Sequence, residues 1–398
     1  MHRFAYILPI ATAVGIVVWR EQWEQAWIYL FGVALCELIL YLVIHRASRQ
    51  REFLSAFSLN VQHHEPWVER VVTTETYTDS RGKTHTRTRV HYISHPDRWL
   101  MEFNTGYVVD ITPKTYTKCI LKWQTQEEWI NPPHINCVSG GGGQLYKWNK
   151  KYKDAFTATY SGLYINYIKN SRSIFRFRDI SDEEAATLGL VKYPSLEGTN
   201  LDIPVVLCSS KVAKRYAVPK GFQRALQLVN AFNGERRQIH IFVILFDASQ
   251  QPLSVAMEQR AYWEGGNKNE FTLCLGLDLS QEGQAPRVSW SKAFSWCDVP
   301  RLESASESWF ISHPELDLEA YAEWLRENIS LWKRKQFKDF KYLGIRLSPA
   351  RTAIVYVVAL ILSAAMFAIA LWVDESHKSN ESVAREYYER SSYYNDFY

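Results

Sequence analysis

The sequence lacks the cysteine spacing of a zinc site or of a disulfide framework. Its six cysteines are scattered along the chain and form no CxxC pair. Zinc sites need closely spaced ligands, and disulfide frameworks belong mainly to small secreted domains. We therefore expect free thiols in a reducing cytoplasm. The six are Cys36, Cys119, Cys137, Cys208, Cys274 and Cys297.

Motifs of phosphate-binding and nucleophilic enzymes are also missing. The glycine-rich run Ser139–Gln144 is followed neither by Gly-Lys-Ser/Thr nor by a capped helix, so we interpret it as a linker. No GxSxG occurs, and the strand-to-turn segment Cys208–Ser210 has no evident base. These absences leave no activity that a motif can name.

Charge is nearly absent from three apolar runs, Phe4–Trp19, Ala26–Ile44 and Thr352–Val373. The third has 22 residues without a charge, and about 20 suffice to cross the hydrocarbon of a bilayer. The first run is short and contains Pro9, so a cleaved secretory signal is the alternative. The sequence predicts three transmembrane helices: a hairpin within residues 1–44 and one span at 352–373.

Glu37 lies near the middle of the second run. An acid at that depth is costly and usually faces a neighbouring helix. We expect a protonated side chain hydrogen-bonded to the backbone or to a hydroxyl such as that of Tyr6 or Tyr356. A proton or ion relay, as in a transporter or channel, is the less favoured interpretation.

Basic residues flank the soluble region at both ends, which predicts that residues 45–351 are cytoplasmic and that the tail at 374–398 is exterior. The same side chains are predicted to face anionic lipid headgroups. Nucleic acid is an unlikely partner, because the basic excess lies next to the predicted spans. The headgroup-facing residues are Arg46, Arg49, Arg51, Lys333, Arg334 and Lys335.

Residue patterning predicts an α+β soluble region. Residues 45–60 resemble an amphipathic connector helix, and 61–215 a β-rich domain. Residues 216–345 show the order αβαββα of an α/β layer structure. The expected β elements of the first half are hairpins at 68–78/84–94 and 99–103/107–111 and strands at 157–168 and 173–177, around a helix at 113–123. In the second half we expect helices at 221–232, 253–263 and 317–340 and strands at 238–246, 271–277 and 288–294.

The second half resembles the TPM domain over roughly residues 220–340. The similarity rests on the apolar strand Gln238–Phe246, the segment Ala261–Asn269 with its glycines and Lys-Asn pair, and the strand Phe271–Leu277. Glu270 stands where the family has a second glycine. The resemblance implies a membrane-anchored domain, in some members similar to acid phosphatases or to assembly and repair factors. Those domains usually lie outside the cytoplasm, opposite to the orientation that the charges predict.

Acidic residues follow the predicted strands of the α/β half. Asp247, Asp278 and Asp298 occupy the strand ends, where sites of such folds collect. With Glu264 and Asn267 they could bind a divalent cation, the function that the TPM resemblance suggests. Acids are also ordinary turn residues after strands.

Five of the eleven histidines fall between residues 63 and 95: His63, His64, His85, His91 and His95. On the second strand of the first hairpin, His85 and His91 share the parity of Arg87 and Arg89 and therefore one face. We expect a solvated cationic face opposite Val90 and Tyr92, with a metal site as the alternative.

The leading hypothesis is a non-enzymatic membrane-anchored scaffold, without a cofactor, that presents its cytoplasmic region to a protein partner. The alternative is a membrane-bound, metal-dependent, phosphatase-like hydrolase with a divalent cation at Asp247 and Asp278. The tyrosine-rich tail at 374–398 is expected either to dock on an exterior partner or to be disordered.

Overall fold

The computed structural model describes residues 2–20, 26–123, 127–130, 136–147, 156–165, 179–194, 199–280, 285–297, 299–336, 338–339, 342 and 347–395. The chain divides into two compact units. One comprises Met1–Gln50, Leu163–Ser173 and Phe337–Tyr398, and is called the helical unit. The other comprises Arg51–Gly162 and Ile174–Gln336, and is called the soluble unit.

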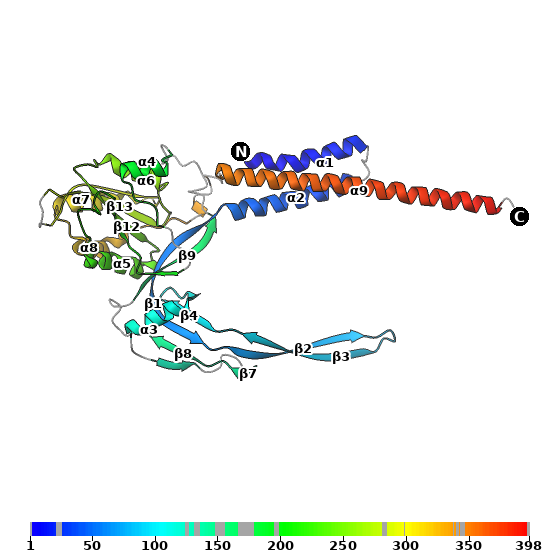
Figure 1. Cartoon of the computed structure of the whole chain (residues 1–398), viewed down its shortest axis with the longest axis horizontal. Helices are drawn as coiled ribbons and strands as arrows, with labels where there is room; N and C mark the ends of the chain where they lie inside the picture. Colours follow the sequence, from blue (N-terminus) through cyan, green and yellow to red (C-terminus); the bar gives the residue numbers. More distant parts are fainter. Residues whose placement is uncertain are drawn as a thin grey trace. The chain divides into compact units, whose positions relative to one another are not determined.

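Three long helices form the helical unit: α1 (Ile7–Arg20, after a 3-10 turn at His2–Tyr6), α2 (Ala26–Ala47) and α9 (Pro349–Asn395) (Figure 1). They pack through narrow stripes of mainly small and branched residues, because small side chains let helix backbones approach closely. One contact cluster holds Ala13, Ile16, Val17, Tyr29, Met366 and Ala370; the other holds Ala5, Leu40, Ile44, Val355 and Ala359.

Two of these helices are long and apolar enough to cross a membrane, over Trp27–Ala47 and Pro349–Val373. Only 22% and 28% of their most apolar windows are buried, whereas a core helix of a soluble protein is mostly buried. The expectation of a third spanning helix needs correction: Phe4–Trp19 is a shorter apolar helix. At 1.5 Å per residue it covers about 24 Å, less than the usual hydrocarbon thickness.

Helix α9 continues past the apolar run to Asn395. Residues 374–395 therefore continue the helix that begins with the apolar run. The alternative expectation, that the tail is disordered, is wrong for these residues. Helix propagation adds a hydrogen bond per residue without a new nucleation cost. A polar, tyrosine-rich segment can thus continue a helix that it could not start.

The expected connector helix at 45–60 is also wrong, because Arg49–His64 forms strand β1. Phe53, Leu54 and Phe57 have helix-like spacing, yet every side chain from Glu52 to Ser58 is buried. A strand covered on both faces shows no alternation of apolar and polar residues. Strand β1 lies centrally in a seven-stranded sheet of order β10-β9-β1-β4-β5, in which β8 also pairs with β1 and with β6.

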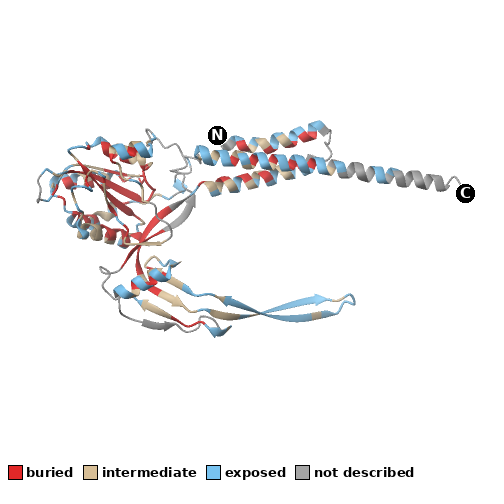
Figure 2. Ribbon diagram, viewed as in Figure 1, coloured by how far each residue is buried: buried red, intermediate tan, exposed pale blue. Residues whose placement is uncertain are grey.

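The structure confirms the first hairpin, formed by β2 (Trp67–Thr78) and β3 (Thr84–His95). The two strands stay paired from Trp67 opposite His95 to Thr78 opposite Thr84. The turn has Gly82 at φ 77°, a conformation that glycine adopts without strain. Beyond its base the hairpin is almost entirely exposed (Figure 2).

The glycine-rich run is not a linker. It lies in strands β7 (Cys137–Gly140) and β8 (Gly143–Lys147), which pair with β2 and β1. A Cβ on Gly140 would lie 2.1 Å from the Pro66 carbonyl oxygen, and one on Gly143 would lie 2.2 Å from that of His63. These glycines are therefore required by close approach of neighbouring backbones.

A small core lies under the seven-stranded sheet. Strands β4 (Arg98–Phe103) and β5 (Val108–Asp110) form the expected second hairpin, and helix α3 (Pro113–Trp123) begins and ends as expected. Strands β6 (Glu127–Ile130), β9 (Thr157–Ile165) and β10 (Thr199–Leu201) complete the sheet. The expected strand at 173–177 lies outside the described residues. The core includes Leu54, Val61, Met101, Phe103 and Tyr116.

The α/β half is a four-stranded sheet of order β11-β12-β13-β14. Strands β11 (Val206–Cys208), β12 (His240–Asp247) and β13 (Glu270–Asp278) are parallel, and β14 (Arg287–Ser295) is antiparallel. The mixed α+β fold is thus as expected. Helices α4 (Asp182–Leu188), α5 (Lys220–Gly234), α6 (Ser254–Tyr262), α7 (Pro300–Ser312) and α8 (Leu318–Asn328) surround the sheet, with a 3-10 turn at Ile329–Leu331 (Figure 1).

The structure of this half differs from the expectation in three places. The single helix expected at 317–340 ends at Asn328, where a 3-10 turn follows. Helix α7, which begins with Pro300 at its first turn, was not foreseen. The half also starts earlier than residue 216, because β11 supplies an edge of its sheet.

Candidate functional site

Asp247 ends β12 and is fully buried. Nη1 of Arg215 donates to its Oδ2 at 2.8 Å, and the backbone N–H and hydroxyl of Ser249 donate to its Oδ1 at 3.0 and 2.5 Å. Burial alone would raise the pKa of this carboxyl, but the hydrogen bonds from Ser249 and Arg215 outweigh it and hold the pKa below its usual value. Asp247 is thus an ionised carboxylate that forms an ion pair with Arg215.

Asp278 is exposed and accepts a hydrogen bond from the backbone N–H of Ser280 at 2.9 Å, as an ordinary turn residue does. The hydrogen bonds from Ser280, and to a smaller extent the charges of Arg287 and Arg215, lower the pKa of the Asp278 carboxyl. Asp298 lies outside the described residues. Within those described, no group of three or more His, Cys, Asp or Glu side chains could hold a metal ion. A divalent cation at Asp247 and Asp278 stays a prediction.

Glu264 and Asn267 do not join these acids. Asn267 lies just before the start of β13, whereas Asp247 is aligned with Leu277 near that strand's end. The seven intervening rungs correspond to about 23 Å along a parallel strand. The structure therefore separates the residues that the sequence grouped.

The histidine-rich hairpin has the two faces that the sequence predicted. His85, Arg87, Arg89 and His91 share one face of β3, since their partners on β2 are all odd-numbered residues. Acidic side chains lie next to the basic ones on this face and balance part of their charge. Arg89 lies 3.7 Å from Glu75, His85 lies 2.9 Å from Asp79, and His95 lies 3.0 Å from Glu69.

A buried polar cluster, which we call the polar joint, lies at the amino ends of β12 and β13. The ammonium of Lys268 pairs with Oε1 of Glu52 on β1, and both side chains are fully buried. Nδ2 of Asn269 donates to the Phe53 carbonyl oxygen at 2.7 Å, and the hydroxyl of Ser55 lies 2.7 Å from Nδ1 of His240. Three polar contacts thus connect one β-rich strand with the α/β sheet.

The segment before β13 holds Lys268 in place. Glu270 accepts hydrogen bonds from the hydroxyl of Tyr193 and, at 2.7 Å, from the backbone N–H of Asn267. Gly266 has φ 77°, and a Cβ there would lie 2.6 Å from Oε2 of Glu270. Glycine is therefore required at position 266. The hydrogen bond from the Asn267 N–H to the Glu270 carboxylate fixes the loop that precedes β13.

Burial controls the protonation of the polar joint. It lowers the pKa of Lys268, while the charge and hydrogen bond of Glu52 oppose that shift. Burial also lowers the pKa of His240 to about 3, so the imidazole is neutral at physiological pH. The joint is closed to solvent, and we infer that it stabilises the fold.

Sequence reasoning missed the polar joint. The available signal is the Lys268-Asn269-Glu270 run between two glycines and an apolar strand. Polar residues at the start of a buried strand must be paired. Their partners on β1 were hidden because that segment was interpreted as a helix.

The basic flanks do not all behave alike. Arg46, Arg49 and Lys333 are exposed, as lipid contact requires. Arg334 is instead only 28% exposed, with Nη2 3.6 Å from Oε1 of Glu52. The guanidinium is turned inward, and its charge therefore adds to that of Lys268 beside the Glu52 carboxylate. The side chain of Arg51 lies outside the described part, and Lys335 donates its backbone N–H to the sulfur of Cys297.

Glu37 lies in the part of α2 that packs near the Tyr6 and Tyr356 cluster. Its Oε1 is buried and accepts no hydrogen bond from the residues that the structure describes. The expected hydrogen bond is therefore not made by this oxygen.

Comparison of the chain with protein-family models, with curated proteins and with solved structures found no match.

Proposed function

We propose that this chain is a membrane-anchored interaction protein, in which the β2–β3 hairpin of the soluble unit contacts a protein partner. The helical unit supplies the anchor. Its two spanning-length helices expose large apolar side chains such as Phe31 and Trp372, and so broad an apolar surface is stable in lipid but not in water.

One observation carries the proposal: the hairpin leaves in solvent a face with a single charged residue. This face, which we call the threonine face, pairs Thr74, Thr76 and Thr78 with three threonines of β3 and continues into one valine–valine pair and Tyr92. Val72 and Tyr92 are 49% and 66% exposed. Arg70 is the single charged residue on it. The β3 members are Thr84, Thr86, Thr88, Val90, Tyr92 and Ser94.

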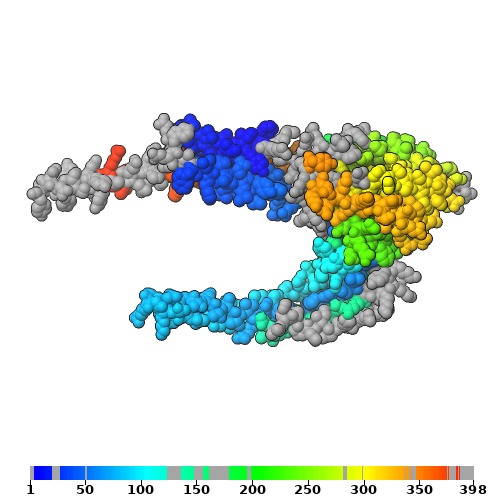
Figure 3. All heavy atoms as spheres, turned by 180° about the vertical axis from the view of Figure 1, so that it is seen from behind, coloured from blue at the N-terminus to red at the C-terminus, as the bar shows by residue number. Residues whose placement is uncertain are grey.

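An isolated two-stranded hairpin is marginally stable in water. The β2–β3 hairpin extends as a narrow arm, light blue in Figure 3, and in the described part of the chain no strand pairs with the outer edge of β3. Soluble proteins usually protect long edges with charges, bulges or a covering element. Contact with a partner strand or sheet would supply that protection.

The orientation follows from the basic flanks: the soluble unit is proposed to be cytoplasmic and residues after Val373 exterior. Arg46, Arg49 and Lys333 are proposed to contact anionic headgroups. The resemblance of residues 220–340 to the TPM domain remains a proposal, supported by the αβαβ order of the half and by the structural requirement for Gly266.

The test is affinity purification of the intact protein from native membranes after mild crosslinking. Tyr92→Glu with Val90→Glu places charge on the threonine face, and Arg87→Glu with Arg89→Glu alters the opposite face as a matched control. We expect specific partners to be lost only with the first pair. Equal recovery with both pairs would contradict the proposal.

A further inference from the structure

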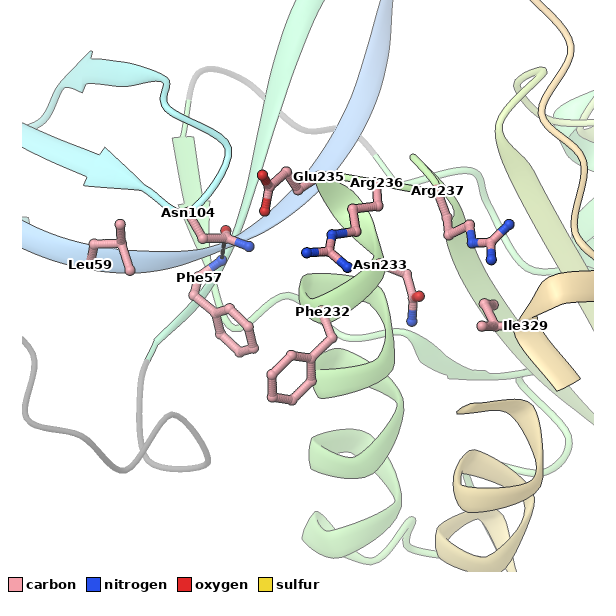
Figure 4. Close-up of a pocket in the computed structure, with 9 residues that line it drawn as sticks. All are labelled: Phe57, Leu59, Asn104, Phe232, Asn233, Glu235, Arg236, Arg237 and Ile329. Carbon is pink, nitrogen blue, oxygen red and sulfur yellow. Dashed lines mark hydrogen bonds between the residues drawn. The ribbon is translucent and has the colours of Figure 1, made fainter. Parts of the chain in front are cut away.

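A hollow of about 490 Å³ lies in the soluble unit where the end of α5 meets β1 and the β4–β5 turn (Figure 4). Its floor is apolar: the ring of Phe232 meets that of Phe57 edge-on at 4.5 Å. Phe232 remains 47% exposed despite this contact. The full lining is Phe57, Leu59, Asn104, Phe232, Asn233, Glu235, Arg236, Arg237 and Ile329.

The walls of the hollow are held by hydrogen bonds and by a close approach of two backbones. The N–H of Phe57 donates to Oδ1 of Asn104 at 2.8 Å, and the N–H of Asn104 donates to the carbonyl of Phe57 at 3.1 Å. A Cβ on Gly234 would lie 1.6 Å from the carbonyl oxygen of Ser55, so α5 touches β1 at its last residue. The hollow is therefore preformed by the crossing of these elements.

The charge at the rim is unbalanced. Arg236 and Arg237 are exposed, and neither guanidinium forms an ion pair with the residues that the structure describes. Arg236 and Glu235 both line the hollow with the two phenylalanines, and in Figure 4 the Arg236 guanidinium lies on the side of Asn104 and Glu235. Among the described lining residues two arginines stand against one acid, Glu235. This excess of positive charge at the rim of a hollow with an aromatic floor matches a carboxylate next to an apolar side chain.

We propose that this hollow binds an acidic peptide segment of the protein partner, with an aromatic or branched side chain on Phe57 and Phe232 and a flanking carboxylate on Arg236. The inference rests on the proposed function, since it names a second contact of the same partner. Peptide anchors commonly fill such pockets while their flanks stay at a polar rim. The exposure of Phe232 and Arg236 fits an open site of this kind.

The test measures binding of a labelled acidic pentapeptide, DEFED, to the full-length protein in detergent micelles by fluorescence polarisation. Saturable binding is expected, with no binding of KKFKK and weaker binding of DEAED. Arg236→Gln with Arg237→Gln should weaken DEFED binding about tenfold, as should Phe232→Ser. Matched controls are Arg301→Gln and Ile311→Ser, both exposed on α7, which should leave it unchanged.

Three results would overturn the inference: no saturable DEFED binding, equal binding of KKFKK, or equal losses in the α7 controls. The fluorescent sulfonate ANS distinguishes a small-molecule site. Saturable ANS binding that is lost with Phe232→Ser but not displaced by DEFED would also overturn it. These readouts concern the hollow alone, so they can fail while hairpin-dependent partner recovery persists, and the reverse.

Discussion

Lys268 and Glu52, separated by 216 positions in the sequence, form an ion pair in which both side chains are fully buried. The pair connects the β-rich sheet to the α/β sheet. A buried pair is costly to form, because both charges leave water, and it persists only where geometry and further hydrogen bonds compensate. Its location links the seven-stranded sheet and the four-stranded sheet within the soluble unit.

Replacing one partner of this pair should destabilise the soluble unit strongly. Lys268→Met leaves the Glu52 carboxylate buried, with Arg334 as the remaining cation near it among the described residues, and we expect a loss of about 3–5 kcal/mol in unfolding free energy. Urea unfolding of the intact protein in detergent measures it. Lys292→Met, which removes a half-exposed pair with Glu307, should cost at most about 1 kcal/mol. Similar losses for the two variants would contradict the structural role.

Removing both partners should cost less than removing one. The double variant Lys268→Met with Glu52→Leu leaves no unpaired carboxylate, and apolar replacement of a buried pair is often nearly neutral. A double-mutant cycle on the same unfolding assay gives the coupling. Additive losses would show that the two residues do not act as a pair.

Acid should destabilise the protein through His240. Its pKa is about 3 when folded and about 6.5 when unfolded. The unfolded state therefore binds more protons between these values. This contribution to stability is complete above pH 6.5 and declines on acidification, by up to about 1.4 kcal/mol per pH unit.

The measurement compares the unfolding free energies of the wild type and of His240→Gln between pH 7.5 and 4.5. Titrating groups that both proteins share contribute equally, so they drop out of the difference. We expect the variant to lose less stability than the wild type on acidification. Parallel pH profiles would mean that His240 is not held neutral in the fold.

Gly234→Ala should separate α5 from β1. The new methyl would overlap the Ser55 carbonyl, and overpacking of this kind costs about 1–3 kcal/mol. A Cβ on Gly15 would meet no atom within 4 Å. Gly15→Ala is therefore the matched control and should have little effect on the unfolding temperature. Thermal unfolding that is unchanged in Gly234→Ala would refute the close approach on which the hollow depends.

Orientation is checked by cysteine labelling of intact cells in a background without native cysteines. Ser80→Cys lies in the hairpin turn and should react only after permeabilisation, whereas Ser392→Cys in α9 should react from outside. Labelling of Ser80→Cys in intact cells would reverse the topology and favour the extracytoplasmic location implied by the TPM resemblance.

Local chemistry allowed much of the fold to be predicted. The β2–β3 hairpin was foreseen because valine, threonine and tyrosine flank a turn with Gly82, and α3 because Pro113 and the apolar spacing mark it. Strand β1 was not foreseen, since burial on both faces removes the period of two. The same error hid the polar joint, whose partners come from distant segments.

The candidate sites were harder to foresee for a physical reason. Asp247 was correctly expected at the carboxyl end of a buried strand, but its neutralisation by Arg215 depends on a loop 32 residues earlier. The hollow near Phe232 depends on a glycine contact between α5 and β1. Such arrangements are set by tertiary packing, which spacing along one segment does not encode.

The central claim is that the threonine face of the hairpin contacts a protein partner at the membrane. Its most direct test replaces Tyr92 with the photo-crosslinking residue p-benzoylphenylalanine in the intact protein in native membranes, with Ile311 replaced in a parallel control. We predict a discrete crosslinked product from position 92 and none from position 311 after irradiation. No product at position 92, or the same products at both positions, would contradict the account.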